Sequence, residues 1–253
     1  MDVVVEVENV SKAFDSNVVL EDLSLKIEEG ENVTIFGRSG TGKSVLLKCI
    51  VGLLEPDKGD IKFYGHSVLN KPINELNEMR KEIGFLFQSA ALYDSMTVRE
   101  NLEFPLRRIF NFSDKEINQK VITVLEQVGL EKAIDEMPAS LSGGMKKRIG
   151  LARTIITKPK LILYDEPTTG LDPITTKEIS LLITTLQKEL KTTSIVVTHD
   201  ILCARIVSDR AVVLKDGKLR FEGEIENLLK SDDIFLRNFF SDQIIEENRS
   251  NNG

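Results

Sequence analysis

A glycine-rich segment near the start of the chain has residue types and spacing that suit phosphate binding. It reads Gly37-Arg38-Ser39-Gly40-Thr41-Gly42-Lys43-Ser44 and matches the pattern G-x-x-x-x-G-K-[ST]. Its glycines let backbone N–H groups close around the β- and γ-phosphates at the positive end of a helix, where Lys43 adds a charge. The hydroxyl of Ser44 is suited to bind Mg²⁺. We therefore predict a site for ATP with Mg²⁺.

Two acidic residues follow a second apolar run, Leu161 to Tyr164. Asp165 and Glu166 would lie at the carboxyl end of a buried strand, where ligands bind in open α/β sheets. We expect Asp165 to hold the magnesium, usually through water, and Glu166 to polarise the water that attacks the γ-phosphate. Alone, the sequence Asp165-Glu166-Pro167 could simply end a strand. Its pairing with the phosphate-binding segment favours the catalytic interpretation.

A second glycine-rich segment, Leu141-Ser142-Gly143-Gly144-Met145, precedes a helical run to about Ile156. A helix N-terminus of this kind can contact another phosphate, although Ser-Gly-Gly alone is more often a plain helix cap. His199 follows the strand-like run Val196-Val197-Thr198, where a single histidine is more often structural than catalytic. Neither motif alone settles a function.

The predicted elements place these motifs in an α/β fold. Two strands, Val3 to Val10 and Val18 to Ile27, read as an antiparallel hairpin. Thr97 with Glu100 and Ser113 are predicted to cap helices in a helical insertion over about 90–158. Further strands are expected at Asn32 to Phe36, the pair Asp60 to Tyr64 and Ile83 to Phe87, Leu161 to Tyr164, Ser194 to Thr198 and Ala211 to Leu214, with helices from Lys43 to about Leu53 and Pro173 to Leu190. This alternation predicts a mainly parallel sheet.

Composition narrows the function classes further. The net charge of −7 and pI near 5.1 argue against nucleic-acid binding, and Lys146, Lys147 and Arg148 are expected to form a solvated helix face. No run approaches the roughly 18 apolar residues that span a bilayer, and the acidic start lacks a signal peptide's features. We expect a cytoplasmic protein in which Cys49 and Cys203 are buried free thiols.

In their order and types these motifs resemble those of the ABC ATPase family. The resemblance covers residues 2 to about 230 and implies a P-loop NTPase (RecA-like) fold that hydrolyses ATP to drive transport. It implies a head-to-tail homodimer, in which Ser142, Gly143 and Gly144 of one subunit close on the nucleotide of the other. It places Asp172 at the dimer seam and His199 on the γ-phosphate.

The same resemblance assigns two further residues. Gln88 matches a glutamine that contacts magnesium and senses the transmembrane subunit, and Phe14 takes the place of an aromatic that stacks on adenine. A packed hairpin phenylalanine is the alternative for Phe14. The implied ATPase domain spans 2–231, with an antiparallel β-subdomain at its start. The tail 232–253 is expected to form a short docked helix or to reach the partner subunit through Phe235 to Phe240.

A narrower resemblance is to the ATPases of Mla/Mce phospholipid transporters. It lies in Gln88 to Val98, Glu103 to Leu106, LSGGMKKRIGLARTI and YDEPTTGLDPI. Met145 is glutamine in most ABC ATPases and departs from the broad family while agreeing with this branch. The branch implies two integral-membrane permease subunits, a lipid-binding Mce-domain subunit and a position on the cytoplasmic face of the inner membrane.

Other functions remain open at this point. An importer ATPase, such as one for amino acids, shares length and parts of these segments. An iron–sulfur assembly ATPase has this length but serves a soluble scaffold. A chromosome-acting ABC ATPase would carry a long coiled coil or zinc insertion, and no such insertion is present between Lys43 and Leu141.

Overall fold

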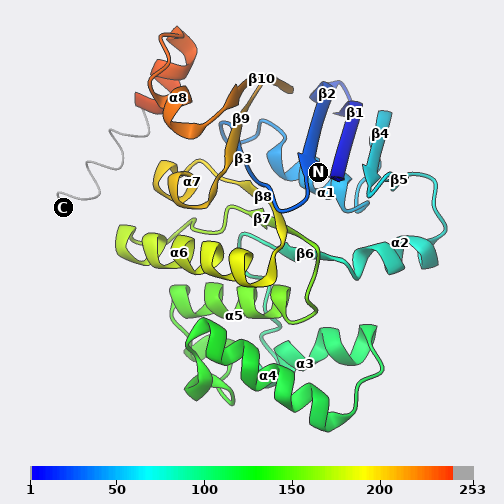
Figure 1. The fold of residues 1–253 in the computed structure, drawn as a ribbon, viewed down its shortest axis with the longest axis vertical. Coiled ribbons are helices and arrows are strands. Elements are labelled where there is room, and N and C mark those ends of the chain that lie inside the picture. Colours follow the sequence, from blue (N-terminus) through cyan, green and yellow to red (C-terminus); the bar gives the residue numbers. More distant parts are fainter. Residues whose placement is uncertain (1, 242–253) are drawn as a thin grey trace.

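The fold consists of two β-sheets that meet at α1 and a group of helices packed beside the larger sheet (Figure 1). It is known from a computed structural model that describes residues 2–241. The first sheet is antiparallel, in the order β2-β1-β4-β5. Its strands are β1 (Val3–Phe14), β2 (Asn17–Glu28), β4 (Lys58–Phe63) and β5 (His66–Ser67). The predicted hairpin of the first two strands is confirmed.

The second sheet holds the predicted catalytic elements and has the order β10-β9-β3-β8-β7-β6. All its strands run parallel except β10, which pairs antiparallel with β9. They are β3 (Asn32–Phe36), β6 (Ile83–Leu86), β7 (Leu161–Asp165), β8 (Thr193–Val197), β9 (Arg210–Lys215) and β10 (Lys218–Gly223). The predicted parallel sheet is confirmed. The expected strands at Asp60 to Tyr64 and Ile83 to Phe87 do not pair, because β4 belongs to the first sheet and β6 to the second.

Helices cover the second sheet and extend away from it (Figure 1). They are α1 (Lys43–Ile50), α2 (Ile73–Arg80), α3 (Val98–Ile109), α4 (Asp114–Val128), α5 (Gly143–Ile155), α6 (Pro173–Leu190), α7 (Ile201–Val207) and α8 (Ile225–Leu229), with 3₁₀ turns at Glu131–Ala133 and Pro138–Ser140. Thr97 and Ser113 form the predicted caps, each in a reciprocal pair with a glutamate three residues on. Within residues 2–241, no helix combines the length and hydrophobicity that crossing a membrane requires.

Three apolar clusters hold these layers together. One lies between the two sheets around α1, and another joins α3 to α6 with the edge of the second sheet. The third contains Phe36 at the end of β3 together with Phe239 and Phe240. Cys49 and Cys203 are buried and free, as predicted.

The end of the described chain packs against its own subunit. Residues 234–241 are helical, and the rings of Phe239 and Phe240 meet Phe36 edge-on at centroid distances of 6.4 and 5.5 Å. These two rings are buried in their own subunit, as expected of a short docked helix, and the alternative contact of Phe235 to Phe240 with a partner subunit stays a prediction. The remainder of the predicted tail, 242–253, lies outside the described residues.

Candidate functional site

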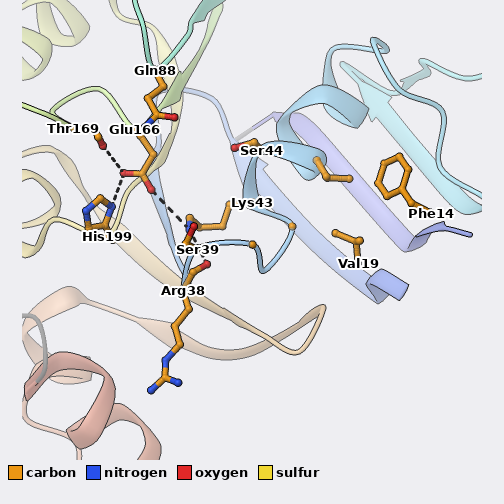
Figure 2. A pocket seen from close by; sticks show the side chains of 13 residues that line it. Phe14, Val19, Arg38, Ser39, Lys43, Ser44, Gln88, Glu166, Thr169 and His199 are labelled. Carbon is orange, nitrogen blue, oxygen red and sulfur yellow. Dashed lines mark hydrogen bonds and ion pairs between the residues drawn. The ribbon is translucent and has the colours of Figure 1, made fainter. Parts of the chain in front are cut away.

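A cavity of about 730 Å³ opens where the two sheets meet, a volume suited to a nucleotide-sized ligand. Most of the predicted site residues line it. Figure 2 shows Phe14 and Val19 on one side and Glu166 with His199 on the other. The lining comprises Phe14, Val19, Arg38, Ser39, Gly40, Gly42, Lys43, Ser44, Val45, Gln88, Glu166, Thr169 and His199.

The floor of the cavity is the loop between β3 and α1. Gly42 precedes the helix with φ of 98°, a conformation that glycine adopts without strain. Gly37 is required for close packing, because a Cβ there would lie 2.6 Å from Thr41 Oγ1 and 2.9 Å from the carbonyl oxygen of Leu214. Lys43 Nζ donates to the carbonyls of Gly37 and Arg38 at 2.7 and 3.1 Å. The loop is thus drawn around a lysine at a helix N-terminus, the geometry of a phosphate site.

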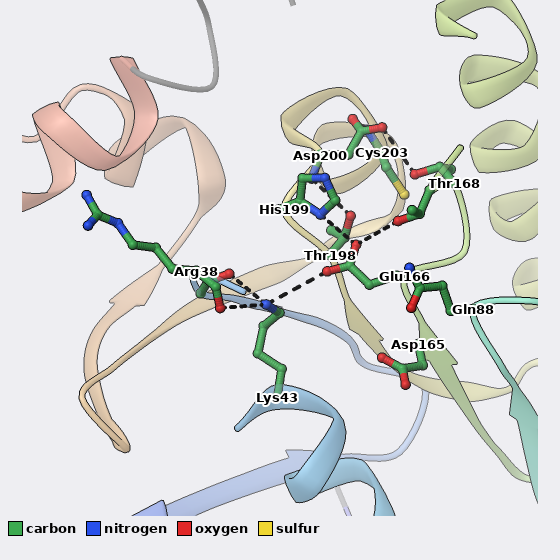
Figure 3. Close-up of polar contacts among 12 residues, drawn as sticks. Arg38, Lys43, Gln88, Asp165, Glu166, Thr168, Thr198, His199, Asp200 and Cys203 are labelled. Atoms are coloured by element: carbon green, nitrogen blue, oxygen red, sulfur yellow. Dashed lines mark hydrogen bonds and ion pairs between the residues drawn. The ribbon is translucent and has the colours of Figure 1, made fainter. Parts of the chain in front are cut away.

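Glu166 lies directly after β7 and contacts both Lys43 of the loop and His199. Its Oε1 is 3.8 Å from Lys43 Nζ, and its Oε2 is 2.8 Å from His199 Nδ1 (Figure 3). Thr169 Oγ1 donates to Oε2 at 3.2 Å. Burial raises the pKa of Glu166, but the hydrogen bond to His199 and the charges of His199 and Lys43 act against burial and hold the pKa below its ordinary value. The carboxylate is therefore ionised at neutral pH.

Asp165 and Ser44 form a second contact beside Glu166. Ser44 Oγ donates to Asp165 Oδ1 at 2.8 Å, and Gln88 lines the same cavity. Burial raises the pKa of Asp165 above its ordinary value, and the hydrogen bond from Ser44 offsets only part of this. A cation here would favour the charged carboxylate.

The oxygen donors at this position fit magnesium. Mg²⁺ is typically held by one or two carboxylates, waters and substrate phosphates rather than by a protein cage. Ser44, Asp165 and Gln88 supply a hydroxyl, a carboxylate and an amide. Among residues 2–241, no group of three or more His, Cys, Asp or Glu side chains could hold a metal ion. Waters and substrate phosphates would therefore supply the other ligands of the magnesium.

Phe14 stands at the opposite side of the cavity from Glu166 (Figure 2). Its side chain is 45% exposed, and Lys12 Nζ lies 5.6 Å from the ring centroid. The alternative of a packed hairpin phenylalanine does not describe it. An exposed ring at the cavity wall is suited to stacking on a planar ligand.

The remaining predicted residues form a second group away from this cavity. Ser142 caps α5 by accepting from Met145 N at 3.3 Å, and Asp172 caps α6 by accepting from Ile174 N and Thr175 N, each at 3.0 Å. The start of α5 faces the start of α6, because a Cβ on Gly144 would lie 2.8 Å from Thr175 Cγ2. Ser142, Gly143, Gly144 and Asp172 do not line the cavity that contains Lys43.

Sequence reasoning missed one residue of this region, Lys147. It was expected on a solvated helix face, yet its side chain is only 6% exposed. Its Nζ donates to the carbonyls of Gln88 and Glu166, the latter at 3.3 Å. The helical spacing of Lys147, Gly150 and Leu151 was the available signal, since it places the lysine on the buried face of α5.

Comparison with known proteins points to one family. A family model described as ABC transporter matches residues 20–169. The intermembrane phospholipid transport ATP-binding protein MlaF of Haemophilus influenzae is 41% identical over 235 residues, covering 93% of this chain and 89% of that protein. The probable ribonucleotide transport ATP-binding protein mkl of Mycobacterium leprae is 40% identical, covering 95% and 70%. The methionine import ATP-binding protein MetN of Clostridium tetani is also 40% identical, covering 92% and 71%.

A solved structure gives the same picture of the fold. The ATP-binding cassette MJ0796, a dimer in a post-hydrolysis state with ADP and Pi bound, superposes with a TM-score of 0.81. It is 34% identical and covers 87% of this chain and 98% of that chain. The likeness therefore extends over most of the chain.

Proposed function

The chain belongs to the ABC transporter family as an ATP-hydrolysing subunit, and we propose that the transporter it drives moves phospholipid between membranes. The observation that carries the ATPase assignment in this molecule is the position of the Glu166 carboxylate. It lies between Lys43, on the phosphate-binding loop, and His199, after β8. A base held beside a phosphate cradle is the arrangement that hydrolysis of a phosphoanhydride requires.

Most residues of the cavity have a part in this reaction. Phe14 stacks on the adenine, and the loop from Gly37 to Gly42 holds the phosphates with Lys43. Glu166 is ionised, so it orients the attacking water and accepts hydrogen bonds from it. His199 contacts the γ-phosphate and fixes the Glu166 carboxylate through its Nδ1. Magnesium, held by Ser44, Asp165 and Gln88, would neutralise charge on the phosphate oxygens.

A complete site needs two chains. Ser142, Gly143, Gly144 and Asp172 sit at the exposed starts of α5 and α6, outside their own chain's cavity. We propose that they close on the nucleotide of a second copy in a head-to-tail dimer. The dimeric cassette MJ0796, which is similar over 87% of this chain, supports this arrangement.

The lipid assignment rests on similarity rather than on the site. MlaF is 41% identical over 93% of the chain, and Met145 agrees with that branch. We propose two integral-membrane permease subunits and an Mce-domain subunit as partners, with the ATPase on the cytoplasmic face of the inner membrane. No nucleic-acid partner is proposed, given the net charge of −7.

A methionine or other amino-acid importer is the second candidate. The MetN protein of Clostridium tetani, at 40% identity over 233 residues, is nearly as similar as MlaF. The two functions differ in their membrane subunits.

Purification of the tagged subunit from its own membranes separates these functions. We expect a permease and an Mce-domain protein to copurify, and the complex to hydrolyse ATP. Glu166→Gln should lower kcat by more than about 100-fold while ATP still binds, because the amide keeps the shape but cannot act as base. Glu75→Gln, an exposed change on α2, serves as control. Copurification of an importer permease would support the second candidate, and soluble partners alone would overturn both.

A further inference from the structure

A buried lysine on α5 connects three parts of the catalytic region. Lys147 lies between Lys146 and Arg148, which are both half-exposed, while its own side chain points into the protein. Arg148 instead pairs with Glu178 at 2.9 Å on the outside of the helix. The three neighbouring basic residues thus occupy different environments, and only the central one reaches the site.

The ammonium group of Lys147 is shared between two backbone carbonyls. One belongs to Gln88, just after β6, and the other to Glu166, just after β7. Hydrogen bonds from a charged donor are about twice as strong as neutral ones. The bond to Glu166 acts on a residue whose φ is +51°, a left-handed conformation that a non-glycine residue holds only with support from its surroundings.

The rest of the same helix face fits closely against the segment after Gln88. Arg153 Nη2 donates to the carbonyl of Ala90 at 2.9 Å. At Gly150, α5 packs directly against Ala90, because a Cβ on Gly150 would lie 2.8 Å from Ala90 Cβ. Residues 88–90, α5 and the backbone of Glu166 are therefore in one continuous set of contacts, with Lys147 as the link to Glu166.

Burial of this lysine is unfavourable by itself. Desolvation lowers the pKa of Lys147, while the nearby carboxylates of Glu166 and Asp165 act to raise it. An apolar side chain of similar length would fill the same space without that cost. The positive charge is therefore explained by the two backbone carbonyls that it binds rather than by packing.

We propose that Lys147 is a positioning residue that fixes the backbone of Glu166 to that of Gln88, so that ATP turnover depends on it while ATP binding does not. This inference rests on the proposed ATPase function. Lys147 Nζ donates to two backbone oxygens, and the residue lies outside those that line the cavity. It acts on the reaction through Glu166, and it links the backbone of Glu166 to Gln88, the residue expected to sense the transmembrane subunit.

The test compares Lys147→Met, Lys147→Arg and the control Lys188→Met, an exposed change at the end of α6, in the purified complex. We expect Lys147→Met to lower kcat at least about tenfold with KM for ATP within about twofold of the parent, since a misplaced catalytic group costs rate rather than binding. Lys147→Arg keeps a cationic donor and should restore most of the rate. Lys188→Met should match the parent.

Three results would overturn the proposal. The first is a Lys147→Met variant with unchanged kcat. The second is a parallel loss of kcat, ATP affinity and thermal midpoint that arginine does not restore, which indicates a structural role only. If Lys147→Met does not fold, Lys147→Leu, which also lacks a donor, is judged by the same criteria. The third is an inactive parent complex in which Glu166→Gln changes nothing; this result overturns the proposed ATPase as well and so differs from the other two.

Discussion

His199 Nδ1 and Glu166 Oε2 lie 2.8 Å apart, so a histidine after β8 and a glutamate after β7 form one hydrogen-bonded pair across neighbouring strands. The hydrogen bond to Glu166 raises the pKa of His199 above its ordinary value of 6.5, and burial offsets only part of this. The protonated pair contributes stability at pH below the unfolded-state pKa of histidine and loses it as pH rises through the folded-state pKa.

We therefore expect His199 in the nucleotide-free protein to titrate above 6.5. In Glu166→Gln its pKa should fall, because the charge partner is gone. An NMR titration of the imidazole resonances, assigned by the signal missing in His199→Gln, measures both values. An equal pKa in the parent and in Glu166→Gln would show that the pair does not form in solution.

Substitution of Gly37 should weaken nucleotide binding. A Cβ at this position would lie 2.9 Å from the backbone carbonyl of Leu214, which cannot move without shifting β9. Gly37→Ala is expected to weaken ATP binding by at least about tenfold, measured with a fluorescent ATP analogue. Gly65→Ala is the control. Alanine at the φ of +74° of this residue should cost stability. The residue lies in the turn between β4 and β5, so ATP affinity should stay unchanged.

Removal of the Phe240 ring should destabilise the protein. The ring is buried edge-on against Phe36, which immediately precedes the phosphate-binding loop. Phe240→Ala should lower the free energy of unfolding by about 3–5 kcal/mol, as measured by urea denaturation. Ile234→Ala, whose side chain is 77% exposed, should change it by less than about 0.5 kcal/mol. Similar values for the two variants would contradict the packing of this helix.

The two cysteines should be inert in the native protein. Burial raises the pKa of Cys49 to about 11 and that of Cys203 to about 12. At pH 8 neither thiol is ionised, so a disulfide reagent should react with the native chain slowly and with the urea-unfolded chain at two sites. Rapid reaction of either thiol in the native state would show that its cluster opens readily.

Local patterns were sufficient to predict the catalytic elements. The strand before Gly37, the helix after Lys43 and the caps at Thr97 and Ser113 are each encoded within a few residues, and each was found where the sequence placed it. The dipeptide Asp216-Gly217 is a further local signal, typical of a tight turn, that the sequence analysis did not use. Both residues have positive φ, 51° and 73°, as the tight turn between β9 and β10 requires.

Features that depend on distant partners could not be predicted in this way. The buried environment of Lys147 is created by carbonyls 59 and 19 positions away. The docking of Phe239 depends on Phe36, at the other end of the chain. A residue's neighbours in sequence do not reveal such contacts, so a basic run reads as a solvated face, and the expected docked helix gave no indication that it packs on Phe36.

The position of β3 in its sheet has a consequence for how the chain folds. This strand carries the phosphate-binding loop, yet it lies between β8 and β9. Ser194 Oγ, for example, donates to Asn32 Oδ1 from 162 positions along the chain. Pairings of such high contact order form slowly, and during synthesis β3 leaves the ribosome long before its neighbours exist. The nascent chain therefore exposes an unpaired apolar strand for most of translation, a segment that a chaperone would recognise.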